Sequence, residues 1–285
     1  MAILHFPATA KSAYDLRILS FAGRGSKSIV YRAEDINTRK KFMVKELFPH
    51  ILEASNVLSR SSNGDVIWSI DSYDYRDMIQ FHFQHGFSII ERCIHSNPEF
   101  NGVVKPVGCF QHHNTLYIIS EDDGSVEWNP YKESSIRTII SDFIDVCNLI
   151  GNLHKTENCV LVLDVAASNF VKSDHVRLCD FDSLLYRHEC INGVKMLFSD
   201  ENASPELLAQ KREEITSLSD VYSIGSLLHR VLIAFQQNNE TPQLPPFVLN
   251  ALFECCCSSM RCNPSNRLSS AFLFASKLKM IYDML

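Results

Sequence analysis

The fold is decided by two neighbouring stretches, Leu163-Asp164-Val165-Ala166-Ala167-Ser168-Asn169-Phe170 and Leu178-Cys179-Asp180-Phe181-Asp182. In the first, the carboxylate of Asp164 can accept or orient a hydroxyl proton, and the amide of Asn169 can hold a metal ion. In the second, the carboxylate of Asp180 can bridge a divalent ion to phosphates. Aspartate and asparagine also cap ordinary turns, so neither stretch is specific alone. Their order and spacing together predict phosphate chemistry.

A glycine-rich turn earlier in the chain fits the same chemistry. It reads Gly23-Arg24-Gly25-Ser26-Lys27-Ser28-Ile29-Val30 and lies between two predicted strands. Its glycines let backbone amides approach a phosphate without a Cβ clash. An ordinary tight turn would look similar, but the position between two strands favours a loop that covers the phosphates of ATP.

A lysine ends the apolar strand that follows this turn. The strand reads Phe42-Met43-Val44-Lys45. Lys45 is suited to pair with the α- and β-phosphates of a nucleotide. A solvated lysine at a strand end is the commoner case. The glycine turn before Lys45 is what favours a phosphate-binding role for it.

Apolar periodicity outlines a strand-rich first part and a helical second part. We expect strands near residues 16–21, 29–31, 42–45, 103–110 and 115–120. Residues 50–75 are predicted to be an irregular insertion with a hairpin turn at Asn63-Gly64. Helices are expected at 76–95 and 134–155, where apolar residues recur every three or four positions, and mainly helices follow residue 203. This order predicts an α+β protein.

In these motifs the chain resembles the eukaryotic-like Ser/Thr protein kinases. The resemblance continues in three segments further along the chain. Phosphate chemistry alone does not require these segments. They are Ala203-Ser204-Pro205-Glu206, Ser219-Asp220-Val221-Tyr222-Ser223-Ile224-Gly225 and Asn263-Pro264-Ser265-Asn266-Arg267. Lys45-Glu46-Leu47-Phe48-Pro49 and the Asp-Phe-Asp turn are similar to a bacterial branch of the family. The resemblance implies one kinase-like domain over residues 1–285. Its small lobe, five antiparallel strands and one helix, ends near residue 121, the hinge spans 121–124, and a mainly helical large lobe covers 125–285.

The resemblance also implies roles for individual positions. Asp164 would be the catalytic base, Lys45 would pair with the phosphates of ATP bound between the lobes, and Asn169 and Asp180 would hold Mg²⁺ or Mn²⁺. The other positions expected at the nucleotide lie in the glycine loop, on the small-lobe helix and at the hinge: Gly23, Gly25, Ser28, Val30, Glu91, Ser120, Glu121 and Asp122.

Two further roles implied by the resemblance are structural. Glu206 and Arg267 should form an ion pair in the large lobe. Asp220 should brace the loop that carries the base. None of these three residues is assigned to the nucleotide.

Several positions depart from the family pattern. Ala166 replaces a lysine that neutralises the transferring phosphoryl group, and losing one preorganised donor costs about 3–4 kcal/mol in barrier. Val162 and Leu163 replace the His and Arg before the base, so an active enzyme would not need a phosphorylated activation loop. Asp182 replaces a glycine, where it would stabilise the turn or reach a second metal ion.

The helix partner of Lys45 is open at this stage. Counting back without gaps from Val103 selects Glu91. The apolar register of the helix selects Gly86 instead, and the usual ion pair would then be absent. The departures therefore leave three functions: an active Ser/Thr protein kinase, a pseudokinase that binds nucleotide or acts as a scaffold, and a small-molecule kinase.

Composition excludes other classes of protein. A net charge of −6, from 27 basic and 33 acidic residues, argues against a general nucleic-acid binder. No apolar run reaches the ~18–20 residues that span a bilayer, and the first residues lack the basic segment of a signal peptide. The ten cysteines are dispersed, and we expect free thiols in a reducing compartment rather than disulfides or a zinc site. We therefore expect a cytoplasmic protein whose partners are ATP and an unidentified protein.

Overall fold

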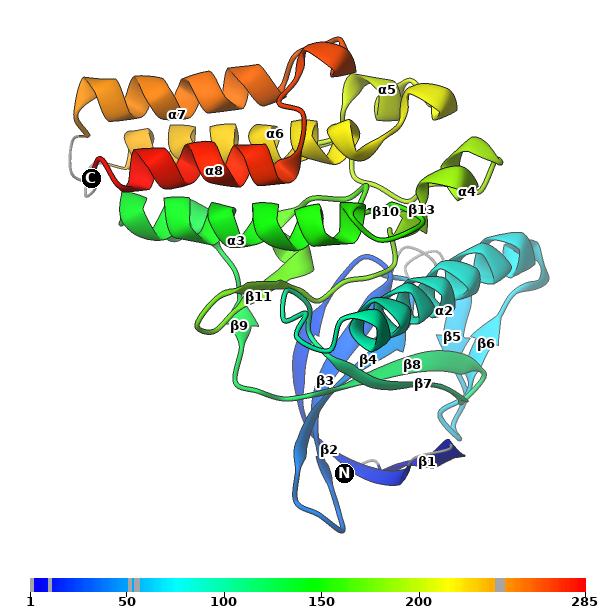
Figure 1. Ribbon diagram of the computed structural model, residues 1–285. Helices are drawn as coiled ribbons and strands as arrows, with labels where there is room; N and C mark the ends of the chain where they lie inside the picture. Colours follow the sequence, from blue (N-terminus) through cyan, green and yellow to red (C-terminus); the bar gives the residue numbers. More distant parts are fainter. Residues whose placement is uncertain (1–2, 10–11, 51–52, 54–56, 239–243) are drawn as a thin grey trace. The chain divides into compact units, whose positions relative to one another are not determined.

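The computed structural model describes residues 3–9, 12–50, 53, 57–238 and 244–285. Contacts within the chain divide it into two compact units, the first formed by residues 1–91 and 104–124 and the second by residues 92–103 and 125–285. The first unit is built mainly on strands and the second mainly on helices (Figure 1). The predicted α+β class is confirmed.

A six-stranded antiparallel sheet forms the first unit, in the order β1-β2-β3-β4-β8-β7. The strands are β1 (Ile3–Thr9), β2 (Ser12–Arg24), β3 (Ser28–Asp35), β4 (Lys41–Leu47), β7 (Pro106–His112) and β8 (Thr115–Glu121). Buried residues alternate with less buried ones along most of β4, as expected where one face is packed, whereas β8 is buried from Thr115 to Ser120. The turn between β7 and β8 was predicted, and His113 and Asn114 adopt positive φ angles there.

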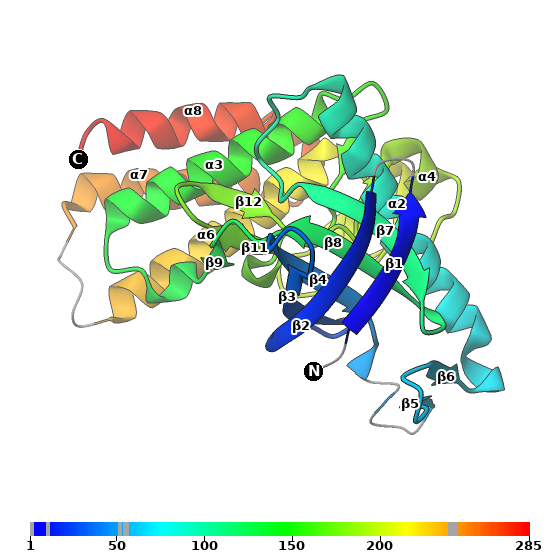
Figure 2. The same cartoon turned by 90° about the horizontal axis from the view of Figure 1, so that it is seen from below.

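The prediction of five strands was wrong by one, because β1 was not foreseen. It pairs with β2 from Ile3 opposite Arg17 to Thr9 opposite Ser12, and the two strands run side by side in Figure 2. Leu4 and Phe6 are buried in the core of this sheet. The Phe6 ring lies 5.0 Å from the ring of Phe110, so the added strand contributes directly to the core.

The insertion between β4 and the helix contains a small hairpin. Its strands are β5 (Leu58–Arg60) and β6 (Val66–Trp68), followed by the short 3₁₀ helix η1 (Ile70–Ser72). Gly64 has a φ of +91°, a conformation that glycine adopts without strain. The predicted hairpin turn at Asn63-Gly64 is therefore confirmed.

Helix α2 (Tyr73–Ser96) matches the predicted helix over 76–95. Its buried residues recur at helical spacing and identify the face that packs inward: Ile79, His82, Phe83, Gly86, Ile89 and Ile90. Residues up to Glu91 belong to the first unit and the remainder of the helix to the second.

The second unit is built around long helices that pack side by side (Figure 1). They are α3 (Ile136–His154), α6 (Ser217–Gln237), α7 (Pro246–Ser259) and α8 (Ala271–Tyr282). Shorter helices are α4 (Arg187–Ile191) and α5 (Pro205–Leu208), with 3₁₀ turns η2 (Pro130–Lys132), η3 (Ala167–Asn169), η4 (Arg212–Glu214) and η5 (Pro264–Asn266). By length and composition α6 alone among the described helices could cross a membrane, but 61% of its apolar window is buried. A helix in the core of a folded domain meets the same criteria of length and composition.

Short strands of the second unit hold the two decisive stretches in place. They are β9 (Val126–Glu127), β10 (Val160–Leu161), β11 (Phe170–Lys172), β12 (Val176–Leu178) and β13 (Leu185–Tyr186). β11 pairs with β9 and β12, and β10 pairs with β13. One stretch thus joins β10 to β11 and the other joins β12 to β13, so paired strands fix both ends of each loop.

Candidate active site

The loop between β10 and β11 joins Asp164 and Asn169 through the asparagine side chain. The amide Nδ2 of Asn169 donates to the backbone oxygen of Asp164 at 2.8 Å and to its carboxylate Oδ2 at 3.0 Å. The backbone oxygen of Asn169 accepts from the N–H groups of Cys179 at 2.9 Å and Asp180 at 3.3 Å. The three polar residues that the sequence singled out therefore belong to one hydrogen-bonded unit.

Ser199, which was not predicted as a site residue, also contacts Asp164. Its hydroxyl donates to Oδ1 of Asp164 at 2.6 Å, and its backbone N–H donates to the same atom at 3.0 Å. Ser199 lies in the segment that precedes α5, seven positions before Glu206. Its nearness to the Ala-Ser-Pro-Glu segment is the feature of the sequence that could have pointed to it.

Asp220 braces the loop that carries Asp164, as predicted. Its carboxylate accepts from the backbone N–H groups of Val162 at 2.8 Å and Leu163 at 2.9 Å. It also lies 2.8 Å from Nε2 of His154 at the end of α3. Leu163 has a φ of +63°, an unfavourable conformation for a leucine that these contacts stabilise.

The side chain of Leu163 lies in an apolar cluster rather than at the surface. The other buried members of the cluster come from β10, β13, α4, the segment between α4 and α5, α5 and the residue after η4: Leu161, Leu185, Cys190, Met196, Ala203, Leu207 and Ile215. The guanidinium of Arg212 also donates to the backbone oxygens of Cys190 and Val194, both at 2.8 Å. Apolar packing and one arginine therefore hold the segment after the Asp-Phe-Asp turn.

Lys172 does not take the place of a lysine at Ala166, because it is paired elsewhere. Lys172 is the nearest lysine along the chain, but its Nζ lies 2.7 Å from Oδ1 of Asp142. Asp142 is buried and also accepts from Nε1 of Trp128 at 2.8 Å. Burial raises the pKa of the Asp142 carboxyl, and the bonds from Lys172 and Trp128 offset that increase only in part. Lys172 therefore stabilises a buried acid.

Asp182, the residue that replaces a glycine, is buried within the Asp-Phe-Asp turn. Its side chain is 2% exposed, and its backbone N–H donates to Oδ1 of Asp180 at 3.1 Å. Because glycine could donate the same backbone bond, both roles named for the Asp182 side chain stay predictions.

In the first unit, the arm of the glycine loop that leads into β3 is bonded to the segment after β4. The backbone oxygens of Lys27 and Ser26 accept from the N–H groups of Phe48 at 2.9 Å and His50 at 3.0 Å. Gly25 donates its N–H to the backbone oxygen of Ser28 at 2.9 Å. The loop thus continues the pairing of β3 with β4.

Two predicted loop residues, Ser28 and Val30, begin β3 itself. Ser28 is buried, and Val30 lies directly opposite Lys45 in the register of β3 with β4. The fold therefore brings the loop and the lysine onto adjacent strands. Their contact with nucleotide stays a prediction.

Phe83 is the helix residue found against Lys45. The Nζ atom of Lys45 lies 5.2 Å from the centre of the Phe83 ring, within the range of a cation–π interaction. Glu91 is exposed and forms no ion pair with a residue that the structure describes, whereas Gly86 lies on the buried face one turn from Phe83. The geometry disfavours Glu91 as the partner of Lys45 and favours the register in which Gly86 takes that place.

The predicted hinge residues follow one another at the end of β8. Ser120 is buried in the strand, and Glu121 is its last residue. Asp122 donates its N–H to the backbone oxygen of Lys41 at 3.1 Å and accepts from Gly124 N–H at 3.1 Å. The first unit ends at Gly124, which has a φ of +80°.

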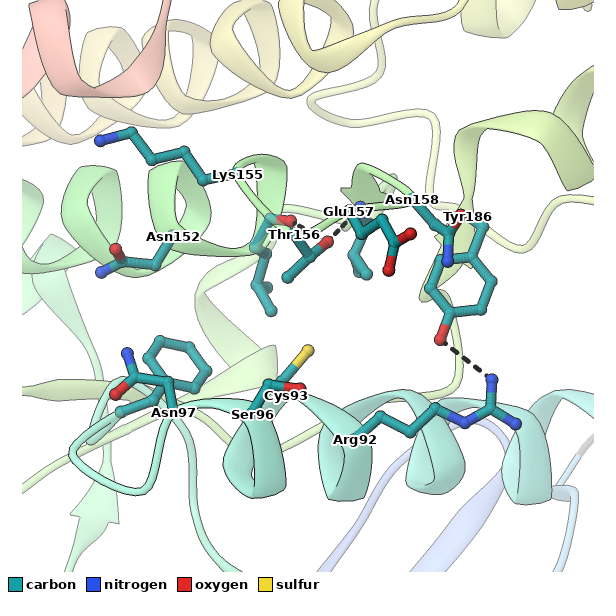
Figure 3. A pocket seen from close by; sticks show the side chains of 13 residues that line it. Arg92, Cys93, Ser96, Asn97, Asn152, Lys155, Thr156, Glu157, Asn158 and Tyr186 are labelled. Carbon is teal, nitrogen blue, oxygen red and sulfur yellow. Dashed lines mark hydrogen bonds between the residues drawn. The ribbon is translucent and has the colours of Figure 1, made fainter.

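A pocket of about 600 Å³ lies in the second unit, between the end of α2 and the end of α3 (Figure 3). At one side Arg92 donates to the hydroxyl of Tyr186 at 3.2 Å. None of the site residues predicted from the sequence lines this pocket. It is therefore separate from the residues described above.

Comparison with known proteins identifies the fold. No family model matches the chain, and no curated protein matches it in sequence. The apo form of PpkA-294 has a TM-score of 0.66 at 16% identity, over 93% of this chain and 95% of that one. The PknI kinase domain of Mycobacterium tuberculosis has a TM-score of 0.62 at 15% identity, again over 93% of this chain and 95% of that one. The chain has the fold of a bacterial-type protein-kinase domain. Sequence identities of 15–16% support a shared fold but not a shared activity or substrate.

The structure confirms the predicted ion pair between Glu206 and Arg267. Two parallel contacts join the side chains, at 2.6 and 2.8 Å, and both residues are almost fully buried. Ser219 adds a hydrogen bond to Glu206 at 2.7 Å. The pair links α5 to the segment after α7. Its role is structural, and it is not part of the hydrogen-bonded unit around Asp164.

The donor set of the kinase fold suits a hard divalent cation. Nδ2 of Asn169 faces Asp164, and no described residue donates a hydrogen bond to its Oδ1. An amide oxygen together with the carboxylate of Asp180 fits Mg²⁺, which takes few protein oxygens beside phosphate oxygens. Over the described residues no group of three or more His, Cys, Asp and Glu side chains could hold a metal ion by itself.

The cysteine run at the end of α7 offers no metal site. Cys255 and Cys256 are buried, whereas Cys257 and Cys262 are exposed. Burial raises the pKa of the Cys255 and Cys256 thiols, which disfavours the thiolate form that zinc requires. The two buried thiols act as small apolar side chains, as expected.

Proposed function

We propose that the protein is an ATP-dependent protein kinase that transfers the γ-phosphate to a Ser or Thr hydroxyl. The observation that carries the proposal is the double contact of Asn169 Nδ2 with Asp164, at 2.8 and 3.0 Å. The backbone oxygen of the same asparagine accepts from the N–H of Asp180. A base and two metal-binding oxygens held on one rigid framework suit phosphoryl transfer, in which positioning supplies most of the catalysis.

In the proposed reaction the substrate hydroxyl oxygen attacks the γ-phosphorus, and the bond from that phosphorus to ADP breaks. Asp164 takes the hydroxyl proton, and Ser199 and Asn169 hold its carboxylate in one orientation. Bound Mg²⁺ would neutralise charge on the phosphate oxygens. Gly23, Gly25 and Lys45 would bind the phosphates, and Glu121 and Asp122 the adenine. Glu206, Arg267 and Asp220 support a protein rather than a small-molecule substrate, since phosphate chemistry alone requires none of them.

The test is phosphate transfer from γ-labelled ATP in the presence of Mg²⁺, with and without generic protein substrates. We expect labelled protein from the wild type, and loss of the label in Asp164→Ala. The matched control is Asp174→Ala, because Asp174 is an exposed aspartate in the turn between β11 and β12. Equal labelling of wild type and Asp164→Ala would contradict the proposal.

The second candidate function is a pseudokinase that binds nucleotide without transferring phosphate. Ala166 favours it, because Lys172 is already paired with Asp142. Mg²⁺-dependent ATP binding with no label on any protein, in every substrate mixture, would support this function over the first. Label appearing only on a sugar or antibiotic would point instead to a small-molecule kinase.

A further inference from the structure

The β5–β6 hairpin is anchored to the sheet by one arginine. Arg60 forms a bidentate pair with Glu46 of β4, with its two terminal nitrogens each 2.9 Å from Oε1 and one of them also 2.9 Å from Oε2. Its guanidinium lies 4.7 Å from the centre of the Phe48 ring. The insertion is therefore fastened to the strand that carries Lys45.

Glu46 is a buried acid with a full set of donors. It is 2% exposed, and it accepts from the hydroxyls of Tyr31 at 3.0 Å and Tyr117 at 2.7 Å as well as from Arg60. Burial and the nearby carboxylate raise the pKa of both tyrosines above their usual value. Since successive side chains of a strand point to opposite faces, this network fixes the strand on one face while Lys45 occupies the other.

A second set of contacts fastens β6 to the turn between β7 and β8. Val66 donates its N–H to the oxygen of His113 at 2.8 Å, and Asn114 Nδ2 donates back to the oxygen of Val66 at 2.8 Å. Nε1 of Trp68 donates to the oxygen of Asn114 at 3.3 Å. The hairpin is thus held at both of its strands.

The apolar side of the hairpin packs on α2. One cluster contains Leu58, Val66 and Trp68 of the hairpin, Ile79 and Phe83 of the helix, and Leu47, Phe48, Leu116 and Ile118 of the sheet and the residue after β4. Phe83 is completely buried in this cluster, and its ring is the one that lies 5.2 Å from Lys45 Nζ. A continuous set of contacts runs from Arg60 through the hairpin and α2 to Lys45.

We propose that the β5–β6 hairpin positions Lys45 for nucleotide by holding α2, and with it the Phe83 ring, against the sheet, with the Arg60–Glu46 pair as its anchor. Arg60, Glu46 and Phe83 are then positioning residues. The proposal rests on the nucleotide-binding role proposed above for Lys45. It does not require a glutamate of α2 beside the lysine, because apolar packing fixes the helix.

The first test compares Arg60→Ala with Arg17→Ala. Arg17 is a matched control, because its side chain is 32% exposed against 34% for Arg60 and it also pairs with a glutamate of the same unit, Glu34. We expect the dissociation constant for Mg²⁺-ATP to rise about 10-fold in Arg60→Ala and to stay within about twofold in Arg17→Ala. Binding is measured by titration at a temperature where each variant is fully folded.

Hydrogen exchange supplies a readout that needs no nucleotide. We expect the amides between Ile79 and Ile90 to exchange faster in Arg60→Ala than in Arg17→Ala, because local opening of a helix follows the loss of its packing partner. If Arg60→Ala does not fold, Phe83→Leu replaces it, since leucine keeps an apolar side chain and removes the ring face. A severalfold weaker affinity is expected there, measured at a temperature where the variant is fully folded, together with a lower unfolding midpoint because a smaller side chain replaces a fully buried ring.

Lys45→Met separates the two proposals. If Lys45→Met weakens binding while Arg60→Ala and Phe83→Leu bind as the wild type does, the positioning role is overturned and the nucleotide role of Lys45 stands. If Lys45→Met itself binds Mg²⁺-ATP as the wild type does, the nucleotide role fails first, and the positioning role falls with it. A lowered unfolding midpoint with unchanged affinity and exchange in Arg60→Ala would also overturn the positioning role.

Discussion

Ser199 donates two hydrogen bonds to one oxygen of Asp164, and the shorter one, at 2.6 Å, comes from its hydroxyl. Bonds to a charged group contribute about 1.5–3 kcal/mol, so Ser199→Ala is expected to lower kcat roughly 10- to 100-fold. KM for ATP should stay unchanged, because the base orients the acceptor hydroxyl. Steady-state kinetics check this, with Ser276→Ala on α8 as the control. A change confined to KM would contradict it.

Ala166 is the residue whose replacement should increase activity. Ala166→Lys restores a cation two positions after the base, and one preorganised donor is worth about 3–4 kcal/mol of barrier. We expect the initial rate of phosphate transfer to rise about 10-fold or more. The control is Ala209→Lys at the exposed end of α5. An unchanged or lower rate in Ala166→Lys, with an unchanged unfolding midpoint, would show that the loop does not use a cation there.

Residue types and their spacing in the sequence grouped three polar residues, whose catalytic and metal-binding roles stay predictions. Asp164, Asn169 and Asp180 were identified this way, and the structure bonds them together. Ser199 was missed because serine is common in loops and its contact with the base spans 35 positions of chain. Lys172 could not be assigned either, since its partner Asp142 lies on a different element.

Apolar packing and the hydrogen bonds of Arg212 hold the segment between the Asp-Phe-Asp turn and α5. Leu163 lies in its apolar cluster where the family has an arginine, and Arg212 bonds the backbone around α4. We therefore expect phosphatase treatment to leave the specific activity unchanged, with mass spectrometry to verify that no phosphate remains. A loss of fivefold or more would mean that a phosphorylated residue holds the segment.

The Glu206–Arg267 pair joins α5 to the segment after α7. Burial raises the pKa of Glu206, but bonds from Arg267 and Ser219 outweigh it, so the net pKa lies below the ordinary value. Its contribution to stability is therefore complete above about pH 4.5 and is lost as the pH falls through the lower, folded-state pKa. Glu206→Gln should cost about 3–5 kcal/mol near pH 7, because Arg267 stays buried and unpaired.

Urea unfolding at two pH values checks this expectation. The difference between wild type and Glu206→Gln should be large at about pH 7 and smaller at about pH 3.5, where the wild-type pair is being protonated. Glu201→Gln is the control, since Glu201 pairs with Arg230 at the surface and such pairs contribute about 0–1 kcal/mol. A pH-independent difference would contradict the assigned pKa direction.

Element-level prediction followed the strength of the periodic signal. The helices α2 and α3 and the strands β2 to β4 were expected close to where they lie, whereas α6, α7 and α8 were expected only as a mainly helical region after residue 203. β1 was missed because its apolar alternation, Leu4 and Phe6, is short and ends at Pro7. The turn of the β5–β6 hairpin was predicted, but its packing on α2 was not, because a turn motif says nothing of long-range contacts. The register of α2 stayed open for the same reason, since Glu91 and Gly86 differ only in tertiary contacts.

At the scale of the whole molecule, the proposed function predicts that nucleotide and metal stabilise the folded protein together. A ligand that binds only the folded state adds about 2.7 kcal/mol at a concentration 100 times its dissociation constant. We expect the unfolding midpoint to rise with Mg²⁺-ATP, and EDTA to remove most of the rise, because the phosphates need the ion as a counter-charge.

Variants of the two units make this prediction specific. Lys45→Met should reduce the stabilisation with and without metal, whereas Asp180→Asn should remove only the part that depends on Mg²⁺, because Asp180 is proposed to bind the ion. Asp283→Asn, at an exposed C-terminal pair with Lys279, is the matched control and should respond as the wild type does. An active kinase and a pseudokinase that binds nucleotide both give this result, so it tests the nucleotide site apart from phosphate transfer. An unfolding midpoint that does not change with ATP at millimolar concentration would contradict both functions. The glycine loop and Lys45 would then have structural roles alone.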